Sequence, residues 1–135
     1  MSEVRRSIAI VDDEDAVRVA LSRLCGAYGW HAQVFATAHH LCDSLLDGHR
    51  PDCLILDVQM PGFGGLDVQA WLRDRGIRIP VILITGREDD GLRAHAFALG
   101  AHAYLGKPMD AGVLLGAIRN AIEGTAPLET HATTA

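Results

Sequence analysis

The sequence predicts an α/β domain, a doubly wound (βα)5 sandwich of three layers built on a parallel five-stranded sheet. Short apolar runs alternate five times with segments of helical periodicity, and the first, third and fourth runs are continuous and rich in Ile, Leu and Val. Continuous apolar strands are typical of a parallel sheet that is covered on both faces. Five βα units with right-handed crossovers would place helices on both sides of this sheet.

The strands are expected at the five apolar runs, in chain order: Ile8–Val11, Ala32–Phe35, Cys53–Leu56, Val81–Ile84 and Ala103–Leu105. Three of the helices show an apolar stripe with helical spacing. The stripes are Val17, Leu21, Leu24 and Tyr28; Ala38, Leu41, Leu45 and Leu46; and Leu114, Ala117, Ile118, Ala121 and Ile122. The third helix is expected at about Leu66–Arg75 and the fourth at about Asp89–Leu99, with less regular stripes.

Capping residues support these boundaries. Thr37 can cap the second helix and Asp110 the last, because their side-chain oxygens accept from free N–H groups of a first turn. Glycines stand where four helices should end, since glycine adopts the left-handed conformation that terminates a helix. They are Gly29, Gly48, Gly76 and Gly100.

The composition excludes several classes of protein. The 135 residues are 49% hydrophobic and 21% charged with a net charge of -5, as in a globular domain. No basic run is present, so direct binding of nucleic acid is not expected. No apolar run is long enough to span a membrane and no signal peptide is recognisable, which favours a soluble cytoplasmic protein. Cys25, Cys42 and Cys53 show no metal-ligand or redox spacing and are expected to be buried and reduced.

Polar residues follow four of the five predicted strands. They are Asp12, Asp13 and Glu14 after the first, Asp57 after the third, Thr85 after the fourth and Lys107 after the fifth. Ligands of doubly wound sheets bind beyond the carboxyl ends of the strands, so these side chains should meet at one edge. Only Ala36 follows the second strand, which indicates that this strand lies away from the site.

Converging carboxylates repel one another, and a hard divalent cation with oxygen ligands such as Mg²⁺ relieves that repulsion. Lys107 would add a second positive charge and Thr85 a hydroxyl. These groups around one carboxylate are what a transferring phosphoryl group needs. Asp57, in the middle, is then interpreted as a nucleophile that forms an acyl phosphate. Each motif alone has an ordinary structural explanation, such as a helix cap or a loop, and the interpretation depends on their joint placement.

These motifs resemble a bacterial two-component receiver domain over residues 7–123, and most closely the receivers of regulators with a LuxR-type output domain. The motifs are Val11-Asp12-Asp13-Glu14, Leu56-Asp57-Val58-Gln59-Met60-Pro61 with Gly65, Ile84-Thr85-Gly86, and Tyr104-Leu105-Gly106-Lys107-Pro108 after Gly100-Ala101. The resemblance implies a flavodoxin-like sheet in the order 2-1-3-4-5. Residues 124–135 are then expected to be a disordered tail or the stub of a linker.

The resemblance also implies roles at the site. Asp57 would be the phosphoacceptor for a sensor histidine kinase, and Mg²⁺ or Mn²⁺ would be held by Asp13 and Asp57, by Asp12 through water and by the Gln59 carbonyl. Lys107 would contact the phosphoryl oxygens.

Further implied roles concern switching and lifetime. Thr85 would move toward the phosphoryl group and Tyr104 would swing inward behind it. Gln59 and Arg87 would tune dephosphorylation, and the peptide bond preceding Pro108 would be cis.

The chain departs from the family pattern at three places, which are Gly106, Met109 and the glycine-rich loop with Gly62, Gly64 and Gly65. The output surface implied by the resemblance is the fourth helix, fifth strand and fifth helix, used for a partner, an output domain or a phosphorylation-dependent homodimer. Candidate contact residues there are Arg93, His102, Met109 and Arg119.

Other histidines and the tryptophans have plainer explanations. His39 and His40 are adjacent on a helix and suited poorly to chelation. His95 and His102 are expected on the surface. Trp30 and Trp71 are expected to pack against the sheet or its rim.

Two alternative functions use related folds. A phosphatase of the haloacid-dehalogenase type needs Asp-x-Asp after its first strand and a cap domain, and neither is recognisable here. A flavodoxin-like electron carrier needs a phosphate-binding loop after the first strand, where this chain is acidic.

Overall fold

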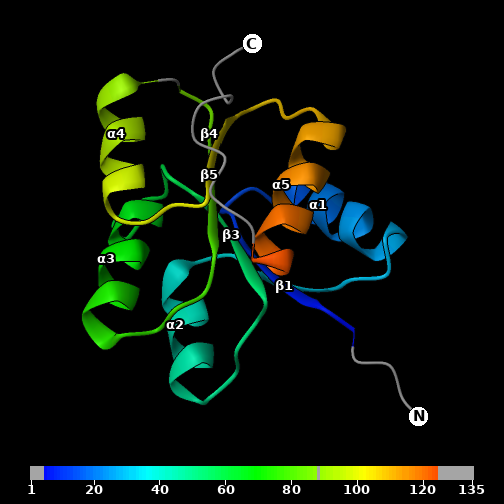
Figure 1. The fold of residues 1–135 in the computed structure, drawn as a ribbon, viewed down its shortest axis with the longest axis horizontal. Coiled ribbons are helices and arrows are strands. Elements are labelled where there is room, and N and C mark those ends of the chain that lie inside the picture. The colour runs from blue at the N-terminus through cyan, green and yellow to red at the C-terminus, as the bar shows by residue number, and fades with distance from the viewer. Residues whose placement is uncertain (1–4, 88, 125–135) are drawn as a thin grey trace.

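The computed structural model describes residues 5–87 and 89–124 and forms a three-layer α/β sandwich (Figure 1). Its five parallel strands lie in the order β2-β1-β3-β4-β5, which confirms the predicted sheet. The strands are β1 Ser7–Val11, β2 His31–Phe35, β3 Cys53–Asp57, β4 Val81–Thr85 and β5 Ala103–Gly106. Each contains the run predicted for it and extends it by one residue at one end or the other.

Five helices cover the two faces of the sheet. They are α1 Asp15–Ala27, α2 Ala38–Leu46, α3 Gly65–Arg75, α4 Asp90–Ala98 and α5 Ala111–Glu123. Figure 1 shows α1 and α5 together on one face and α2, α3 and α4 on the other. The core is accordingly two clusters separated by the sheet. Ile10, Ile55 and Ile84 point to the first face and Leu54, Leu56 and Leu83 to the second.

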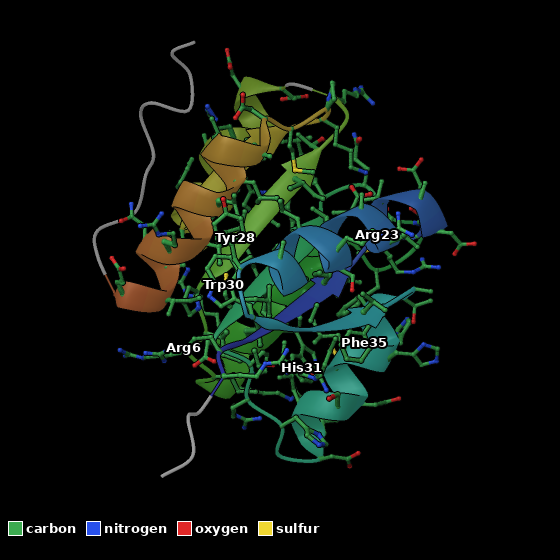
Figure 2. The ribbon with its side chains drawn as sticks, turned by 90° about the vertical axis from the view of Figure 1, so that its right-hand side faces the viewer. Arg6, Arg23, Tyr28, Trp30, His31 and Phe35 are labelled. Atoms are coloured by element: carbon green, nitrogen blue, oxygen red, sulfur yellow. The ribbon has the colours of Figure 1, made fainter. Side chains whose placement is uncertain are left out.

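Two helix stripes were predicted partly wrongly. Tyr28 was assigned to the buried face of the first helix, but the helix ends at Ala27 and Tyr28 is exposed. Its ring stacks instead on Trp30 at the sheet rim, with 5.8 Å between ring centroids (Figure 2). Leu46, in the last turn of α2, is likewise exposed. The buried positions on these helices include two cysteines that the stripes omitted, Cys25 and Cys42.

The predicted caps are confirmed at both helices. The Thr37 hydroxyl accepts from the backbone N–H of His40, and the Asp110 carboxylate accepts from the N–H of Val113. Asp89 was assigned to the fourth helix but is its N-cap, where its carboxylate accepts from Gly91. The glycines expected at helix ends all have positive φ, which favours glycine at these positions: Gly29, Gly48, Gly76 and Gly100.

The cysteines are buried free thiols, as expected. Burial raises the pKa of Cys25 to about 11 and also raises the pKa of Cys42 and Cys53. These thiols are therefore protonated and unreactive at neutral pH. Trp30 and Trp71 pack at the edges of the two clusters, as predicted.

Within the described residues, no helix combines the length and the apolar character needed to cross a membrane. The tail predicted at residues 124–135 lies outside the described residues apart from Gly124.

Candidate functional site

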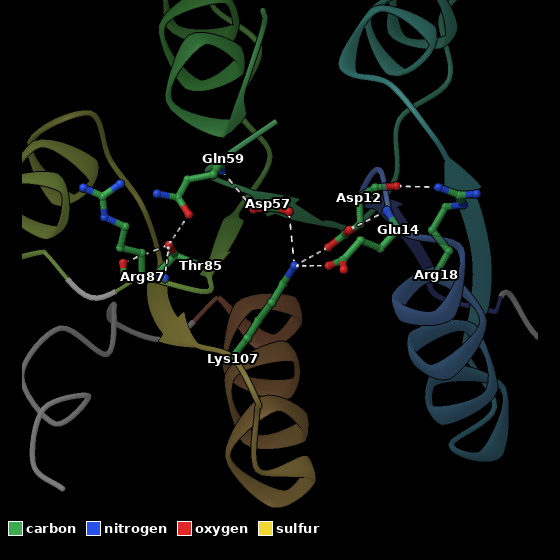
Figure 3. A network of polar contacts seen from close by, with 8 residues as sticks. All are labelled: Asp12, Glu14, Arg18, Asp57, Gln59, Thr85, Arg87 and Lys107. Carbon is green, nitrogen blue, oxygen red and sulfur yellow. Dashed lines mark hydrogen bonds and ion pairs between the residues drawn. The ribbon is translucent and has the colours of Figure 1, made fainter. Parts of the chain in front are cut away.

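Four strands end at one edge of the sheet and bring together the polar residues that follow them (Figure 3). Asp12 follows β1, Asp57 ends β3, Thr85 ends β4 and Lys107 follows β5. This arrangement follows from the topology, because all parallel strands have their carboxyl ends at the same edge. The edge strand β2 is followed by Ala36 and contributes no polar side chain at this position.

Asp57 is a buried carboxylate at the centre of the site, with 4% of its surface exposed. Its Oδ1 accepts a hydrogen bond of 2.9 Å from the backbone N–H of Gln59, and its Oδ2 accepts one of 3.1 Å from Nζ of Lys107. Burial raises the pKa of Asp57, the two hydrogen bonds lower it, and the nearby Asp12 charge raises it again. The net pKa shift is upward, so the ionised carboxylate is destabilised here and would be stabilised by a further cation.

Lys107 is shared by several carboxylates. Its Nζ lies 3.0 Å from Oδ2 of Asp12, 3.1 Å from Oε1 of Glu14 and 3.1 Å from Oδ2 of Asp57. Burial lowers the pKa of Lys107, but the interactions of its ammonium with the three carboxylates outweigh burial and hold the pKa above its usual value. Lys107 is therefore a fixed cation. One lysine cannot neutralise all of these carboxylates, and the site keeps a surplus of negative charge.

Three carboxylates are placed to hold a divalent cation. Oxygens of Asp12, Asp13 and Asp57 lie within 4.8 Å of one another, and no other such group of acidic, histidine and cysteine residues occurs in the described part of the chain. Asp12 is fully buried, and its Oδ2 contacts the Lys107 ammonium without a well-directed hydrogen bond. Hard oxygen ligands, a charge surplus and an incompletely satisfied buried oxygen fit Mg²⁺.

His39 and His40 are not part of this group. The ring of His39 stacks instead on Phe63, with 5.1 Å between centroids.

Thr85 is buried but turned toward the loop after β4 (Figure 3). Its hydroxyl donates to the Arg87 carbonyl at 3.0 Å and accepts from the Arg87 N–H at 3.1 Å. Oε1 of Gln59 lies 3.5 Å from the same hydroxyl. Among the described residues, no hydrogen bond joins Thr85 to Asp57. Gln59 and Arg87 therefore adjoin the hydroxyl expected to move on phosphorylation.

Tyr104 lies inside the fold, on the face covered by α3 and α4. It is 4% exposed and packs in the core, with the Arg93 guanidinium 5.3 Å from its ring centroid. Tyr104 is thus already buried in this structure.

The expectation that His102 lies on the surface, available as a contact residue, is wrong. It is 7% exposed because its backbone N–H donates to the carbonyl of Val81, which extends the β4–β5 pairing to this residue and draws the side chain inward. Burial lowers the pKa of His102. Of the other candidates on that surface, Arg93 and Met109 are half-buried and Arg119 is exposed.

The Lys107–Pro108 peptide bond is cis.

Two glycines next to Asp57 have a packing role that the sequence interpretation missed. A Cβ on Gly64 would lie 2.4 Å from the Val58 carbonyl oxygen. A Cβ on Gly65 would lie 2.8 Å from Cδ2 of Leu83 and 2.9 Å from the Asp57 carbonyl oxygen. These glycines let helix α3 begin directly against the strand end that carries Asp57. A Gly-Gly pair at a predicted helix start was the available signal, because glycine is otherwise unfavourable there.

Arg18 is a second residue that was missed. Its Nη1 donates to the backbone carbonyl of Asp12 at 2.6 Å (Figure 3), and its Nη2 forms an ion pair with Asp15. Arg18 thus ties α1 to the loop that carries the acidic pair. An arginine one turn into the helix that follows an acidic loop was the signal in the sequence.

Comparison with known proteins agrees with this geometry. Residues 8–119 match the family described as the response regulator receiver domain. The chain is 39% identical over 123 residues to the response regulator protein TodT of Pseudomonas putida, covering 91% of this chain and 54% of TodT. It is 36% identical over 115 residues to the transcriptional regulatory protein FixJ of Azorhizobium caulinodans, covering 83% of this chain and 53% of FixJ.

A solved structure is similar over its whole length. The response regulator receiver protein from Burkholderia phymatum has a TM-score of 0.79 and 38% identity, and the match covers 92% of this chain and 100% of that protein. By contrast, the chain spans about half the length of the curated relatives it matches. The family match includes most of the chain and every strand that builds the acidic site, and the chain therefore belongs to the response-regulator receiver domains, whose general function is that of a phosphoaspartate switch in two-component systems.

Proposed function

We propose that Asp57 of this chain accepts a phosphoryl group from a phosphohistidine of a sensor histidine kinase. The observation that carries the proposal is a buried carboxylate with a raised pKa, held between an acidic pair and a lysine. One carboxylate oxygen would bond to phosphorus as the bond from phosphorus to the histidine nitrogen breaks. The chain would catalyse only its own phosphorylation and dephosphorylation, and it would not be a metabolic enzyme.

The proposed cofactor is Mg²⁺, or Mn²⁺ in its place. Asp13 and Asp57 would bind it directly, Asp12 through water, and the Gln59 backbone carbonyl would be a further ligand. The closeness of the three carboxylates supports this assignment. When bound, the cation would neutralise charge on the phosphoryl oxygens.

Lys107 and Thr85 are the proposed phosphoryl-binding residues of the chain. Lys107 already contacts Asp57 Oδ2, so its ammonium lies beside an oxygen of the proposed nucleophile. A phosphoryl group adds roughly -1.5 to -2 charges and three strong acceptors. Thr85 ends the neighbouring strand and would leave its contacts with Arg87 to donate to this group. Tyr104 would respond as the space behind Thr85 changes.

The proposed output surface consists of α4, β5 and α5. It would contact a partner, an output domain of the LuxR type or a second copy of the chain after phosphorylation. Arg93, Met109 and Arg119 remain candidate contacts there. We assign residues 7–123 to the receiver domain, and we place the protein in the cytoplasm because the kinase domains that supply the phosphoryl group act there. No direct contact with nucleic acid or membrane is proposed.

The experiment is incubation with acetyl phosphate and Mg²⁺ followed by intact-mass analysis. Wild type should gain the mass of one phosphoryl group, and Asp57→Asn should gain none because an amide is not a nucleophile. Asp74→Asn, which makes the same change at an exposed position of α3, is the matched control and should be modified like wild type. Full phosphoryl incorporation in Asp57→Asn would show that the acceptor is another residue.

A further inference from the structure

A pocket of about 620 Å³ lies at the edge of the sheet opposite Asp57. One wall is the C-terminal end of α3 with the loop that leads to β4, and the other is the end of α4 with its turn toward β5. Figure 1 shows α3 and α4 on the same face of the sheet. The volume lies in the range of small-molecule sites in proteins. The residues of the proposed phosphorylation site do not contribute to this pocket.

The charged side chains that line the pocket are both cationic. Arg78 is exposed and makes no hydrogen bond or ion pair with any described residue. Arg73 donates from Nη1 to the Ala98 carbonyl at 3.4 Å, which leaves most of its donors available. No carboxylate belongs to the lining. In a chain with a net charge of -5, a concavity with two arginines and no acid favours an anionic ligand.

The remaining lining is largely apolar and includes one buried amide side chain. Leu72 and Val81 are buried, and Ile77 is half-buried beside them. Gln69 is 3% exposed, and its Nε2 donates to the Ala96 carbonyl at 3.2 Å. Its Oε1 has no hydrogen-bond partner among the described residues. That oxygen is itself buried, so a ligand in the pocket would lie against the Gln69 side chain without reaching Oε1, and its polar recognition would fall to the two arginines.

We propose that this pocket binds a small organic anion, a carboxylate on a flat apolar body. The carboxylate would pair with Arg78 and Arg73, for which a guanidinium offers two parallel donors. The apolar body would lie against Leu72 and Ile77. A ligand that contacts both walls would link α3 to α4.

The test is a titration of the full chain, labelled with ¹⁵N and unphosphorylated, with 4-hydroxybenzoate as the probe. Amide signals of both walls, including Ile77 and Gly100, should shift together and saturate, with a dissociation constant below about 1 mM. Two further probes separate the contribution of the negative charge from that of the ring. 4-Hydroxybenzamide keeps the ring and hydroxyl without the charge, and inorganic phosphate keeps the charge without the ring. Each should bind at least about tenfold more weakly.

Two variants locate the site. Arg78→Gln should weaken 4-hydroxybenzoate binding about tenfold, as expected for loss of a charge-assisted pair. Arg23→Gln makes the same change on an exposed arginine of α1, on the other face of the sheet, and should leave the affinity unchanged. The proposal is overturned if the two walls show no saturable shift, if the neutral amide binds as well as the carboxylate, or if both variants bind like wild type. Equal weakening in both variants would also overturn it, because the effect would then be one of overall charge.

Discussion

Replacing Asp57 with asparagine should stabilise the metal-free fold, although it removes the proposed phosphoacceptor. Asp57 is buried beside Asp12 and Asp13, and its pKa is raised chiefly by burial. The amide of an asparagine has nearly the same shape and keeps an oxygen that can accept from the Gln59 N–H. The substitution therefore removes a charge that is unfavourable in the folded state while leaving that hydrogen bond in place.

The size of this stabilisation can be estimated from the distances between Asp57 and the neighbouring charged groups. At an effective dielectric constant of about 20, a carboxylate oxygen within 4.8 Å of another repels it by at least about 3.5 kcal/mol. Two such neighbours, Asp12 and Asp13, outweigh the attraction of about 5 kcal/mol to Lys107 at 3.1 Å. Desolvation adds to the cost of the charge, while partial protonation limits it. We expect a net stabilisation of about 1–2 kcal/mol at neutral pH.

The assay is urea unfolding of wild type and Asp57→Asn in EDTA, with Asp74→Asn as an exposed control that should behave like wild type. Excess Mg²⁺ should then reverse the order, because a ligand at 100 times its dissociation constant stabilises the binding-competent wild type by about 2.7 kcal/mol. If Asp57→Asn were the less stable protein in EDTA at neutral pH, the electrostatic reasoning would be refuted.

The stability difference between wild type and Asp57→Asn should depend on pH in a defined direction. Because the folded state raises the pKa of Asp57 above 3.8, the folded protein binds more protons than the unfolded chain between the two pKa values. The contribution of Asp57 to stability therefore falls as pH rises through that window and is constant above it. The advantage of Asp57→Asn should be complete near pH 7.5 and decrease as pH falls toward about 4.

Three further predictions concern other residues. Burial lowers the pKa of His102 below 6.5, so the folded state should lose stability as pH falls below that value, by up to about 1.4 kcal/mol per pH unit. Thermal unfolding of His102→Gln should show a smaller loss of stability over the same pH range. Gly65→Ala should cost about 1–3 kcal/mol by overpacking in urea unfolding, whereas Gly116→Ala, with open space around its Cβ, should cost nothing. Replacing Gln59 or Arg87 by alanine should change the lifetime of the phosphoprotein without preventing its formation, and decay rates identical to wild type would contradict this.

The fold was largely predictable from the sequence, because its strands and helices are encoded by patterns of neighbouring residues. β4 is buried along its whole length and is apolar over Val81–Ile84, and that pattern is visible without coordinates. The wrong predictions concern residues whose positions are determined by tertiary contacts. Tyr28 continues a helical stripe, but its helix ends one residue earlier and the ring stacks on Trp30. His102 looks like an exposed polar residue, but strand pairing carries it into the interior.

The site was predictable to the extent that topology alone creates it. Residues after parallel strands lie at one edge, so topology places Asp57 and Lys107 on the same side of the sheet, and the long Lys107 side chain reaches past β4 to contact Asp57. The tie from Arg18 to the Asp12 carbonyl could not be predicted in this way, because it depends on the direction of one long side chain on α1. The close approach at Gly65 depends on the depth at which α3 packs on the sheet, which no periodicity encodes.

The contacts of Thr85 indicate how finely the proposed switch is balanced. Moving the hydroxyl toward a phosphoryl group would break two hydrogen bonds to the Arg87 backbone, each worth about 0.5–1.5 kcal/mol net. The new hydrogen bond to a charged phosphoryl oxygen would contribute about 1.5–3 kcal/mol. These two amounts nearly cancel, so Thr85 alone would bias the conformations by no more than a few kcal/mol. Such a bias shifts populations without locking either state. Contacts made by a partner or a second copy at the proposed output surface would then add to this bias.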